Sequence, residues 1–238
     1  MKKEKKIIII VSVLLLVIVA CTLLFHLSKS RTFQFFGNIY ASIPNDSKKV
    51  ALTFDDGPTE NTNAIVMKLN ELDITATFFL CGSDIEKCPE EAKLIADSGF
   101  SIGNHSYSHE RMWFKSYSFY KDEIEKTNEL IRKSGYEGEI YFRPPYGKKL
   151  FVLPFYLKQS EIKTIMWNIE PETDLGFDAT SEQIATDILE KVKSGSIILL
   201  HPMYNSENVL GALDIVVPEL IKQGYSFCSI DEMLNHAK

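Results

Sequence analysis

The chain of 238 residues is long enough for one sizeable domain with an appendage, and its 45% hydrophobic residues supply enough apolar surface for a core. Residues 32–238 hold 20 basic and 31 acidic residues, a net charge of −11, whereas the whole chain carries −6. Such an acidic segment repels a phosphate backbone, so we expect no nucleic-acid partner and a neutral or cationic polymer instead.

The N-terminus has the composition of a membrane anchor. Four lysines among the first six residues precede an apolar run of nineteen residues from Ile7 to Phe25. This run is long enough to cross a bilayer as a helix, and the lysines favour a cytoplasmic start. We predict an uncleaved anchor over residues 1–27, with a cleaved signal peptide or a lipoprotein lipidated at Cys21 as alternatives. Each alternative places the remainder outside the cytoplasmic membrane.

Residues 28–48 contain Ser, Asn, Pro and Lys and are predicted to form a short stalk that enters the domain. Short apolar runs then predict seven strands: Val50–Phe54, Ala76–Cys81, Phe100–Gly103, Ile140–Arg143, Thr164–Trp167, Ser196–Leu200 and Tyr225–Ser229. Amphipathic stretches between them predict five helices: Thr62–Leu72, Pro89–Ser98, Ser118–Ser134, Ser181–Lys193 and Val209–Lys222. This alternation over residues 49–238 predicts an α/β domain, an irregular (β/α) barrel of about seven strands after one transmembrane helix.

Titratable side chains recur where predicted strands end. Two acids follow the first strand, two histidines the third, an arginine the fourth and a histidine the sixth: Asp55 and Asp56, His105 and His109, Arg143, and His201. Ligands of parallel α/β folds collect at the carboxyl ends of the strands. We therefore expect these side chains to share one site.

The spacing of His105 and His109 lets both imidazoles face one point if the segment turns helically. One such pair alone is commonly coincidence or surface capping, but here Gly-Asn precedes it after a strand, and two carboxylates are available nearby. Two histidines and one carboxylate leave a fourth position open, which is the pattern of a catalytic zinc site.

The motifs resemble those of the polysaccharide deacetylase (NodB-homology) family, of carbohydrate esterase type. Four of the family's motifs occur in order: Thr-Phe-Asp-Asp-Gly-Pro at 53–58, the His-x₃-His segment within 102–109, Arg-Pro-Pro-Tyr-Gly at 143–147, and Ile-Leu-Leu-His at 198–201, with Ile where Leu is commoner. The resemblance covers about residues 36 to 236. It implies an irregular barrel and a divalent metal, usually zinc, with cobalt as the alternative.

By position, the resemblance makes Asp56, His105 and His109 the metal ligands. Asp55 would be the general base and His201 the general acid. These roles suit amide hydrolysis, because a metal lowers the pKa of bound water, a free carboxylate accepts the remaining proton, and the departing amine needs an acid.

The third motif would hold the base and the oxyanion. The resemblance implies that Arg143 pairs with Asp55 and that the backbone N–H of Tyr146 faces the developing oxyanion. Pro145 and Leu200 are expected beside the substrate with Tyr146.

The fourth motif departs from the family pattern. An acid, two residues and then Asp-Trp are expected, but residues 167–175 have a longer spacing, and Leu175 stands where Trp is expected. Asp174 is the favoured carboxylate for tuning the acid, with Glu170 and Glu172 as alternatives. This departure puts the binding of the substrate in question.

The sequence thus predicts a membrane-anchored, metal-dependent N-deacetylase that is monomeric and acts on an extracellular N-acetylated glycan, such as peptidoglycan or a chitin-like oligosaccharide. One alternative is a catalytically weak glycan-binding surface protein of the same fold. Another is a hydrolase of a different C–N bond or of an O-acetyl ester. Cys81 and Cys88 are either a disulfide or buried thiols, and the sequence leaves this open.

Overall fold

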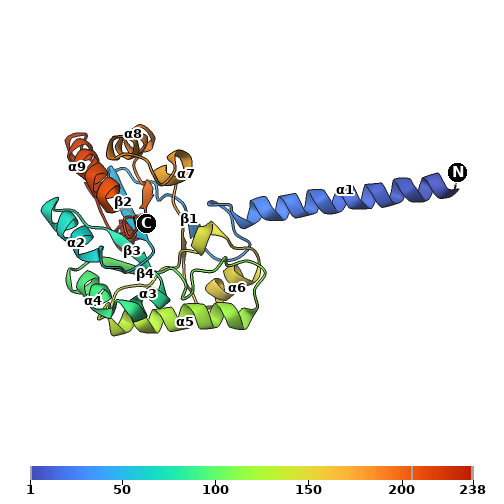
Figure 1. The fold of residues 1–238 in the computed structure, drawn as a ribbon, viewed down its shortest axis with the longest axis horizontal. Coiled ribbons are helices and arrows are strands. Elements are labelled where there is room, and N and C mark those ends of the chain that lie inside the picture. Colours follow the sequence, from blue (N-terminus) through green and yellow to red (C-terminus); the bar gives the residue numbers. More distant parts are fainter. Residues whose placement is uncertain (1, 205, 237–238) are drawn as a thin grey trace.

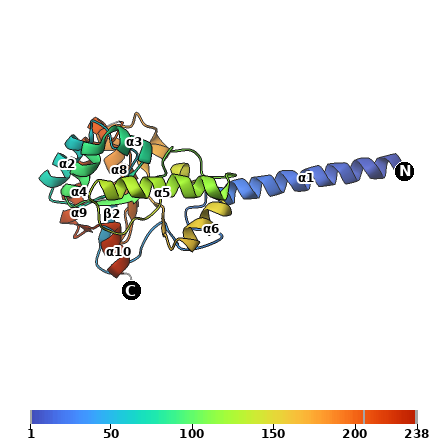
Figure 2. The ribbon, with the colours of Figure 1, turned by 90° about the horizontal axis from the view of Figure 1, so that it is seen from below.

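The computed structural model describes residues 2–204 and 206–236, a rounded domain from which one long helix projects (Figure 1). This helix, α1 (Lys2–Ser28), extends away from the domain in both views (Figures 1 and 2). Apolar side chains cover its length, and its residues Lys3–Ser28 are long and apolar enough to cross a membrane. The helix spans the segment predicted as an anchor.

A ring of parallel strands forms the centre of the domain. In one sheet the order is β4 (Ser101–Asn104), β3 (Thr77–Leu80), β2 (Lys49–Asp55) and β6 (Ile197–Leu200), with β7 (Ser226–Phe227) paired to the start of β2. A second pair joins β1 (Ile39–Tyr40) to β5 (Thr164–Ile165). Single bridges, Asn104–Phe142, Phe142–Thr164 and Ile169–Ile198, connect the two sheets into a closed ring. The predicted irregular barrel is confirmed.

One predicted strand is almost absent. Of the stretch Ile140–Arg143, only Phe142 makes bridges, one to β4 and one to β5. Two prolines follow directly, and proline lacks the N–H that a continuing ladder needs. The short segment still closes the barrel, because its backbone is hydrogen-bonded to Asn104 of β4 on one side and to Lys163 and Ile165 on the other.

The predicted stalk is partly built into the barrel. β1 lies within it, and the N–H of Met166 donates to the carbonyl of Tyr40 at 2.7 Å. The N–H of Ile43 likewise donates to Gly195 at 2.8 Å. The barrel thus includes residues before the predicted domain start at 49.

The five predicted helices are present with small shifts at their ends: α2 (Thr62–Glu71), α4 (Pro89–Asp97), α5 (Tyr117–Lys133), α8 (Ser181–Lys191) and α9 (Ser206–Lys222). Four shorter helices and a 3₁₀ turn were not predicted: α3 (Gly82–Lys87), α6 (Val152–Gln159), α7 (Pro171–Leu175), α10 (Ile230–His236) and Pro145–Gly147. Helices of one or two turns show too little apolar periodicity to be recognised in a sequence.

Alternation along the strands divides the core into two layers. On β2, Leu52 and Phe54 pack outward against the helices, in one cluster with Ile65 and Leu69 of α2. Ala51 belongs to the other cluster, with Phe79, Met166, Ile197 and Leu199. Full burial of each large apolar side chain contributes roughly 2 kcal/mol. The same alternation turns Thr53 and Asp55 inward with Ala51, at the end of the barrel where β2 ends.

Candidate active site

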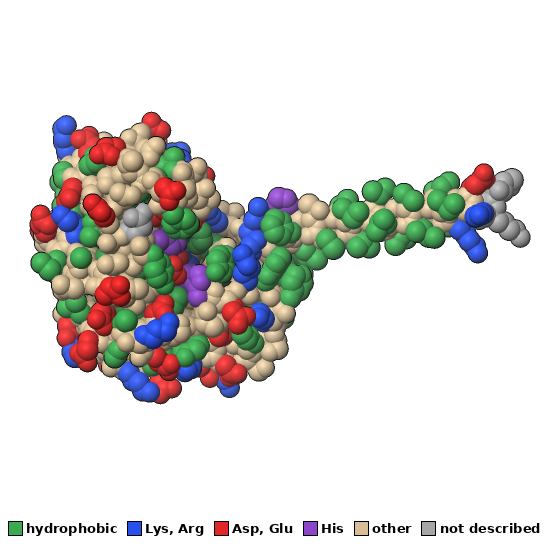
Figure 3. All heavy atoms as spheres, viewed as in Figure 1, with side chains coloured by type: hydrophobic (Ala, Val, Ile, Leu, Met, Phe, Trp, Pro, Cys, Tyr) green, Lys and Arg blue, Asp and Glu red, His purple; other side chains and the backbone are tan. Residues whose placement is uncertain are grey.

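A cavity of about 620 Å³ opens where the strands of the barrel end. It is lined by most of the titratable residues predicted to share a site, together with aromatic side chains: Asp55, Asp56, His105, His109, His201, Tyr146, Trp167 and Phe177. Histidine side chains are visible inside this hollow on the surface (Figure 3). The structure therefore brings together residues from four separate strand ends.

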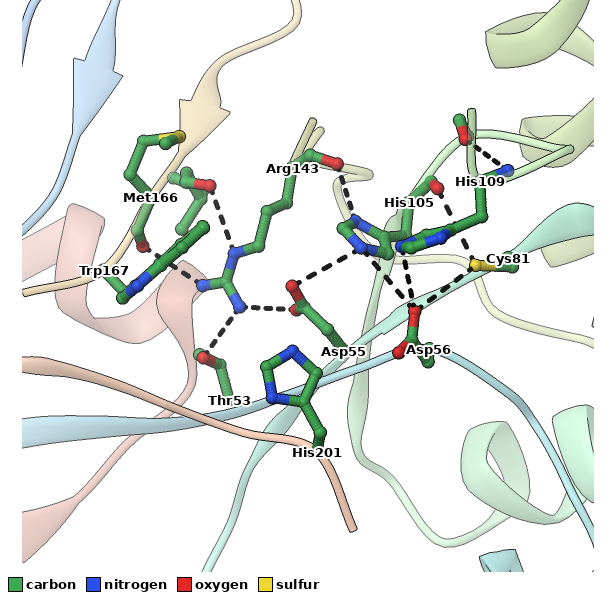
Figure 4. A network of polar contacts seen from close by, with 12 residues as sticks. Thr53, Asp55, Asp56, Cys81, His105, His109, Arg143, Met166, Trp167 and His201 are labelled. Carbon is green, nitrogen blue, oxygen red and sulfur yellow. Dashed lines mark hydrogen bonds and ion pairs between the residues drawn. The ribbon is translucent and has the colours of Figure 1, made fainter. Parts of the chain in front are cut away.

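Asp55 and Arg143 form a buried ion pair at the base of the cavity (Figure 4). Arg143 is fully buried, and its Nη1 donates to Oδ1 of Asp55 at 2.6 Å and to Oγ1 of Thr53 at 2.9 Å. Its other nitrogens donate to the carbonyls of Ile165 and Met166. Each side of the guanidinium is thus held, and the carboxylate it faces cannot turn away.

The charge of Asp55 follows from this pairing. Burial alone raises the pKa of its carboxyl group, but the charges of Arg143, His105 and His201 and the hydrogen bond from Arg143 outweigh burial and lower the pKa below its ordinary value. Asp55 is therefore an ionised carboxylate at neutral pH. Its second oxygen, Oδ2, lies 3.5 Å from Nε2 of His105.

A left-handed turn lets Asp56 reach the same cavity as Asp55. Neighbouring strand residues normally point to opposite faces, but φ is +72° at Asp56 and +70° at Gly57. A side chain at Gly57 would be strained and would place its Cβ 2.8 Å from Sδ of Met203. The glycine of the Asp-Asp-Gly motif is therefore required by both backbone conformation and packing.

Asp56, His105 and His109 present a compact set of metal-ligating atoms, all within 4.8 Å of one another. Oδ1 of Asp56 lies 3.2 Å from Nε2 of His109 and 3.8 Å from Nε2 of His105. Nδ1 of His105 lies 2.8 Å from the carbonyl oxygen of Arg143. If Nδ1 carries the proton it donates to this oxygen, and the lone pair of Nε2 then faces the other two ligands, as in metal-binding histidines.

The donor set fits a divalent cation. One carboxylate and two imidazoles suit zinc and leave coordination positions open. Burial, followed by the neighbouring His105, lowers the pKa of His109, so its imidazole is neutral and available as a ligand at neutral pH. Sγ of Cys81 lies near the same carboxylate, 3.9 Å from Oδ1 of Asp56. The cysteines are free thiols, so Cys81 and Cys88 do not form a disulfide.

The two histidines do not meet through a helical turn, which corrects the sequence prediction. They lie on a loop in which φ is +65° at Ser106 and +57° at His109, and their ring centroids are 5.0 Å apart. The loop is held by Glu123 of α5, whose Oε2 accepts hydrogen bonds from the N–H groups of Tyr107 and Ser108 at 3.0 and 2.9 Å.

Glu123 is a supporting residue that the sequence interpretation missed. It is only 8% exposed, although it carries a carboxylate. Its position on the face of α5 shared by the buried Tyr120, Ile124, Thr127 and Ile131 was the available signal, because an acid on an apolar helix face needs a partner.

Glu172, and not Asp174, is the carboxylate beside His201. Oε1 of Glu172 accepts a hydrogen bond from the backbone N–H of His201 at 3.0 Å and lies 3.7 Å from Nδ1 of its ring. Asp174 instead pairs with Lys191 at the surface, with a distance of 2.7 Å between Oδ2 and Nζ. Residues two positions apart in a helix lie about 200° apart around its axis, so Glu172 and Asp174 cannot both face the cavity.

Glu170, the other alternative to Asp174, does not contact His201 and has different partners. Its Oε2 accepts hydrogen bonds from Nη2 of Arg31 and from Nε1 of Trp167, both at 2.7 Å. Burial by itself lowers the pKa of His201, but the nearby carboxylate of Glu172 and the charge of Asp55 raise it to about 9. His201 is therefore protonated at neutral pH.

An aromatic side chain does line the cavity near the fourth motif, two residues after the expected position. Leu175 lies outside the cavity, against α8. Phe177 lines the cavity, and its ring centroid lies 5.8 Å from that of His201 in an edge-on arrangement.

The third motif places Tyr146 at the rim. Its φ of +56° belongs to the left-handed region, its side chain is 53% exposed, and its ring lies 4.8 Å from that of His109. Tyr146 is the second residue of a 3₁₀ turn, so its backbone N–H has no acceptor within the turn. Pro145, the residue before it, is buried and does not line the cavity.

Leu200 was expected beside the substrate, and the structure corrects this. It is fully buried and packs outward with Leu52 and Phe54. Strand residues alternate in direction, so Leu199 lines the cavity with His201. The prediction was displaced by one residue.

Comparisons with known proteins agree with this geometry. The family model described as Polysaccharide deacetylase matches residues 42–169, more than half of the chain. The chain belongs to the polysaccharide deacetylase family. A peptidoglycan-N-acetylglucosamine deacetylase of Bacillus cereus is 35% identical over 82% of this chain and 71% of its own length.

Solved structures of family members share the fold. The Bc1960 peptidoglycan N-acetylglucosamine deacetylase, crystallised with an N-oxidanyl-benzamide, has a TM-score of 0.76 at 32% identity, covering 81% of this chain and 90% of that one. A Bacillus anthracis protein described as a CE4 family pseudoenzyme has a TM-score of 0.75 at 28% identity, covering 84% and 69%. The family thus includes members described as enzymes and one described as a pseudoenzyme.

Proposed function

We propose that this protein is a metal-dependent deacetylase that removes N-acetyl groups from peptidoglycan or a related glycan of N-acetylglucosamine. One observation carries the proposal: a metal-ligating triad, a carboxylate paired with a buried arginine and a histidine beside a buried glutamate all meet at one cavity. Relatives named as peptidoglycan deacetylases support the choice of substrate.

Asp56, His105 and His109 would hold the cation, with zinc the first choice and cobalt the alternative. When bound, the cation would supply Lewis-acid chemistry, polarising the acetyl carbonyl and lowering the pKa of water. Asp55 would accept the proton of the attacking water, because Arg143 holds it ionised and oriented toward the same cavity.

His201 would then protonate the departing amine. An amine leaves poorly as an anion, and the raised pKa of His201 keeps a proton available at neutral pH. Glu172, whose Oε1 lies 3.7 Å from Nδ1, would stabilise the positive charge of the imidazole. On the opposite side, the N–H of Tyr146 would donate to the oxyanion as the carbonyl carbon becomes tetrahedral.

We further propose that α1 anchors the enzyme in the cell membrane as a single pass, with the catalytic part outside. Residues 1–27 would form the anchor, 28–48 the entry and 49–238 the catalytic domain. The apolar length of α1 and the cell-wall substrates named for relatives support this arrangement. A monomer suffices, because one chain supplies every group of the cavity.

The test is acetate release by the purified full chain in detergent. Substrates would be peptidoglycan glycan strands and N-acetylglucosamine oligomers, each with zinc, with cobalt and with chelator. We expect acetate and deacetylated product by mass spectrometry in the metal samples alone. An absence of product from every substrate and metal contradicts the proposal, and a preference for O-acetyl xylan would assign an esterase instead.

The alternative of a catalytically weak glycan-binding protein has less support. Its basis was the fourth motif, in which Leu175 stands where the aromatic residue of the groove is expected. Phe177 lies beside His201 and supplies an aromatic wall. No group required by the mechanism is missing among the described residues of the cavity.

A further inference from the structure

The segment that follows α1 forms one wall of the active-site cavity. Lys29 and Arg31 line it together with the catalytic groups. The segment is held by Lys149, a buried residue whose N–H donates to the carbonyl of Ser28 at 2.8 Å and whose Nζ donates to the carbonyl of Ser30. The end of the membrane-spanning helix is thus joined directly to the loop that carries Tyr146.

Cationic side chains gather at this wall. Nζ of Lys29 and Nζ of Lys148 lie over the same ring, that of Phe25, at 4.9 and 4.2 Å from its centroid. Lys148 also lies 5.2 Å from the ring of Trp113. Arg111 lines an adjoining cavity that also contacts His109 and Tyr146, and its guanidinium lies 4.7 Å from the ring centroid of Tyr146. Figure 3 shows lysine and arginine side chains where α1 meets the domain, at the rim of the hollow.

These cations lack carboxylate partners. Within residues 2–204 and 206–236, no ion pair involves Lys29, Lys148 or Arg111, although the chain outside the anchor is strongly acidic. Arg31 differs, because it pairs with Glu170 at 2.7 Å. Burial, then the charges of Lys29 and Arg111, lowers the pKa of Lys148, so Lys148 is repelled by both of these cations. An anion placed among them would relieve this repulsion.

We propose that Lys29, Lys148 and Arg111 form a subsite, called here the neck subsite, for a carboxylate on the sugar that neighbours the N-acetyl group under attack. The inference rests on the proposed function. Arg111 stacks on Tyr146, which in turn stacks on His109 of the metal-ligating triad. The neck subsite therefore adjoins the reaction centre, and a peptidoglycan strand without its stem peptides supplies the matching charge, because its lactyl carboxyl groups are then free and ionised.

The phosphate of a membrane lipid is the other anion whose chemistry suits these cations. The observations favour the glycan, because Lys29 and Lys148 line the same cavity as Asp55, Asp56 and His201. A group that neutralised them would occupy the substrate cavity.

The test compares an acidic glycan with its uncharged ester. Peptide-free peptidoglycan oligomers and their carboxyl methyl esters would be given to the metal-loaded full chain in uncharged detergent. We expect a higher kcat/KM for the acid, and we expect Lys29→Gln combined with Lys148→Gln to reduce this acid-over-ester preference about tenfold, mainly through KM. The control Lys222→Gln removes a cation that is 79% exposed on α9 and should keep the wild-type preference.

Binding of both oligomers to the metal-free full chain would be measured by calorimetry, so the result does not depend on turnover. If acetate is released but acid and ester are used and bound equally, the neck subsite is refuted while the proposed function stands. If no acetate is released, the proposed function fails, and calorimetry alone decides the subsite. If the double variant loses binding to anionic vesicles but keeps the acid-over-ester preference, the lysines serve the membrane and the inference is overturned.

Discussion

The carboxylate of Glu172 lies against His201, with Oε1 3.0 Å from the backbone nitrogen and 3.7 Å from Nδ1 of the ring. Both side chains are shielded from solvent, and the pair comes from α7 and from the end of β6. This contact sets the charge of the histidine that faces Asp55. It makes the fourth motif a determinant of the pKa of His201, through Glu172 and not through Asp174.

Replacing Glu172 by Gln should lower the pKa of His201. The negative charge that raises this pKa to about 9 would be lost, while burial would still oppose the charged imidazole. The ring resonance of His201 in metal-free protein, followed by NMR against pH, should titrate at a lower pH in the variant. Asp174→Asn is the control, because Asp174 pairs with Lys191 and should leave the titration unchanged.

The same pKa predicts a direction for stability. The folded value of about 9 lies above the ordinary 6.5, so the contribution is fully present below pH 6.5 and is lost as pH rises through 9. In metal-free protein, denaturant unfolding between these values should show a loss of stability with rising pH that is smaller in Glu172→Gln. An equal pH dependence in both proteins would contradict this assignment.

Asp55→Asn should abolish turnover while the metal content remains. An amide cannot accept the proton of the attacking water, so kcat should fall by about 10³-fold. The amide oxygen can still accept from Arg143, which limits the destabilisation. Metal content by atomic absorption should stay near that of the wild type in Asp55→Asn and fall in Asp56→Asn. Loss of metal from Asp55→Asn alone would mean that the two aspartates exchange roles.

Glu123→Ala should weaken metal binding. Without Oε2 the N–H groups of Tyr107 and Ser108 lose their shared acceptor, and the loop that orients His105 and His109 is released. Supporting contacts of this kind change metal affinity by about 10- to 100-fold. Competition with a chromogenic chelator measures the change. Glu123→Gln keeps one acceptor oxygen and should retain most of the affinity, so equal losses in both variants would argue against this role.

Phe177→Ala should raise KM for a glycan oligomer. Its ring forms the cavity wall beside His201, and removal of an aromatic contact of this kind changes affinity by about fivefold. Initial rates over a range of oligomer concentrations would measure KM and kcat. Leu175→Ala is the matched control, because Leu175 lies outside the cavity and should leave KM unchanged.

The strand-end residues of the site could be predicted from the sequence. Asp55, Asp56, His201 and Arg143 each follow a short apolar run, and strand ends of a parallel barrel meet at one edge. Gly57 also indicated the turn, because glycine permits the left-handed backbone conformation that directs both acids inward. Local residue order therefore determined which groups would gather.

What surrounds these groups was decided by the tertiary structure. The choice of Glu172 over Asp174 depends on how the short helix α7 is rotated against the barrel, and no periodic pattern predicts a helix of five residues. Glu123 and the neck cations Lys29 and Lys148 come from distant parts of the chain. The sequence by itself determined the chemistry of the strand ends, because alternation and turn residues act locally. Only folding decided which charges lie beside them, because those contacts join segments that the sequence holds far apart.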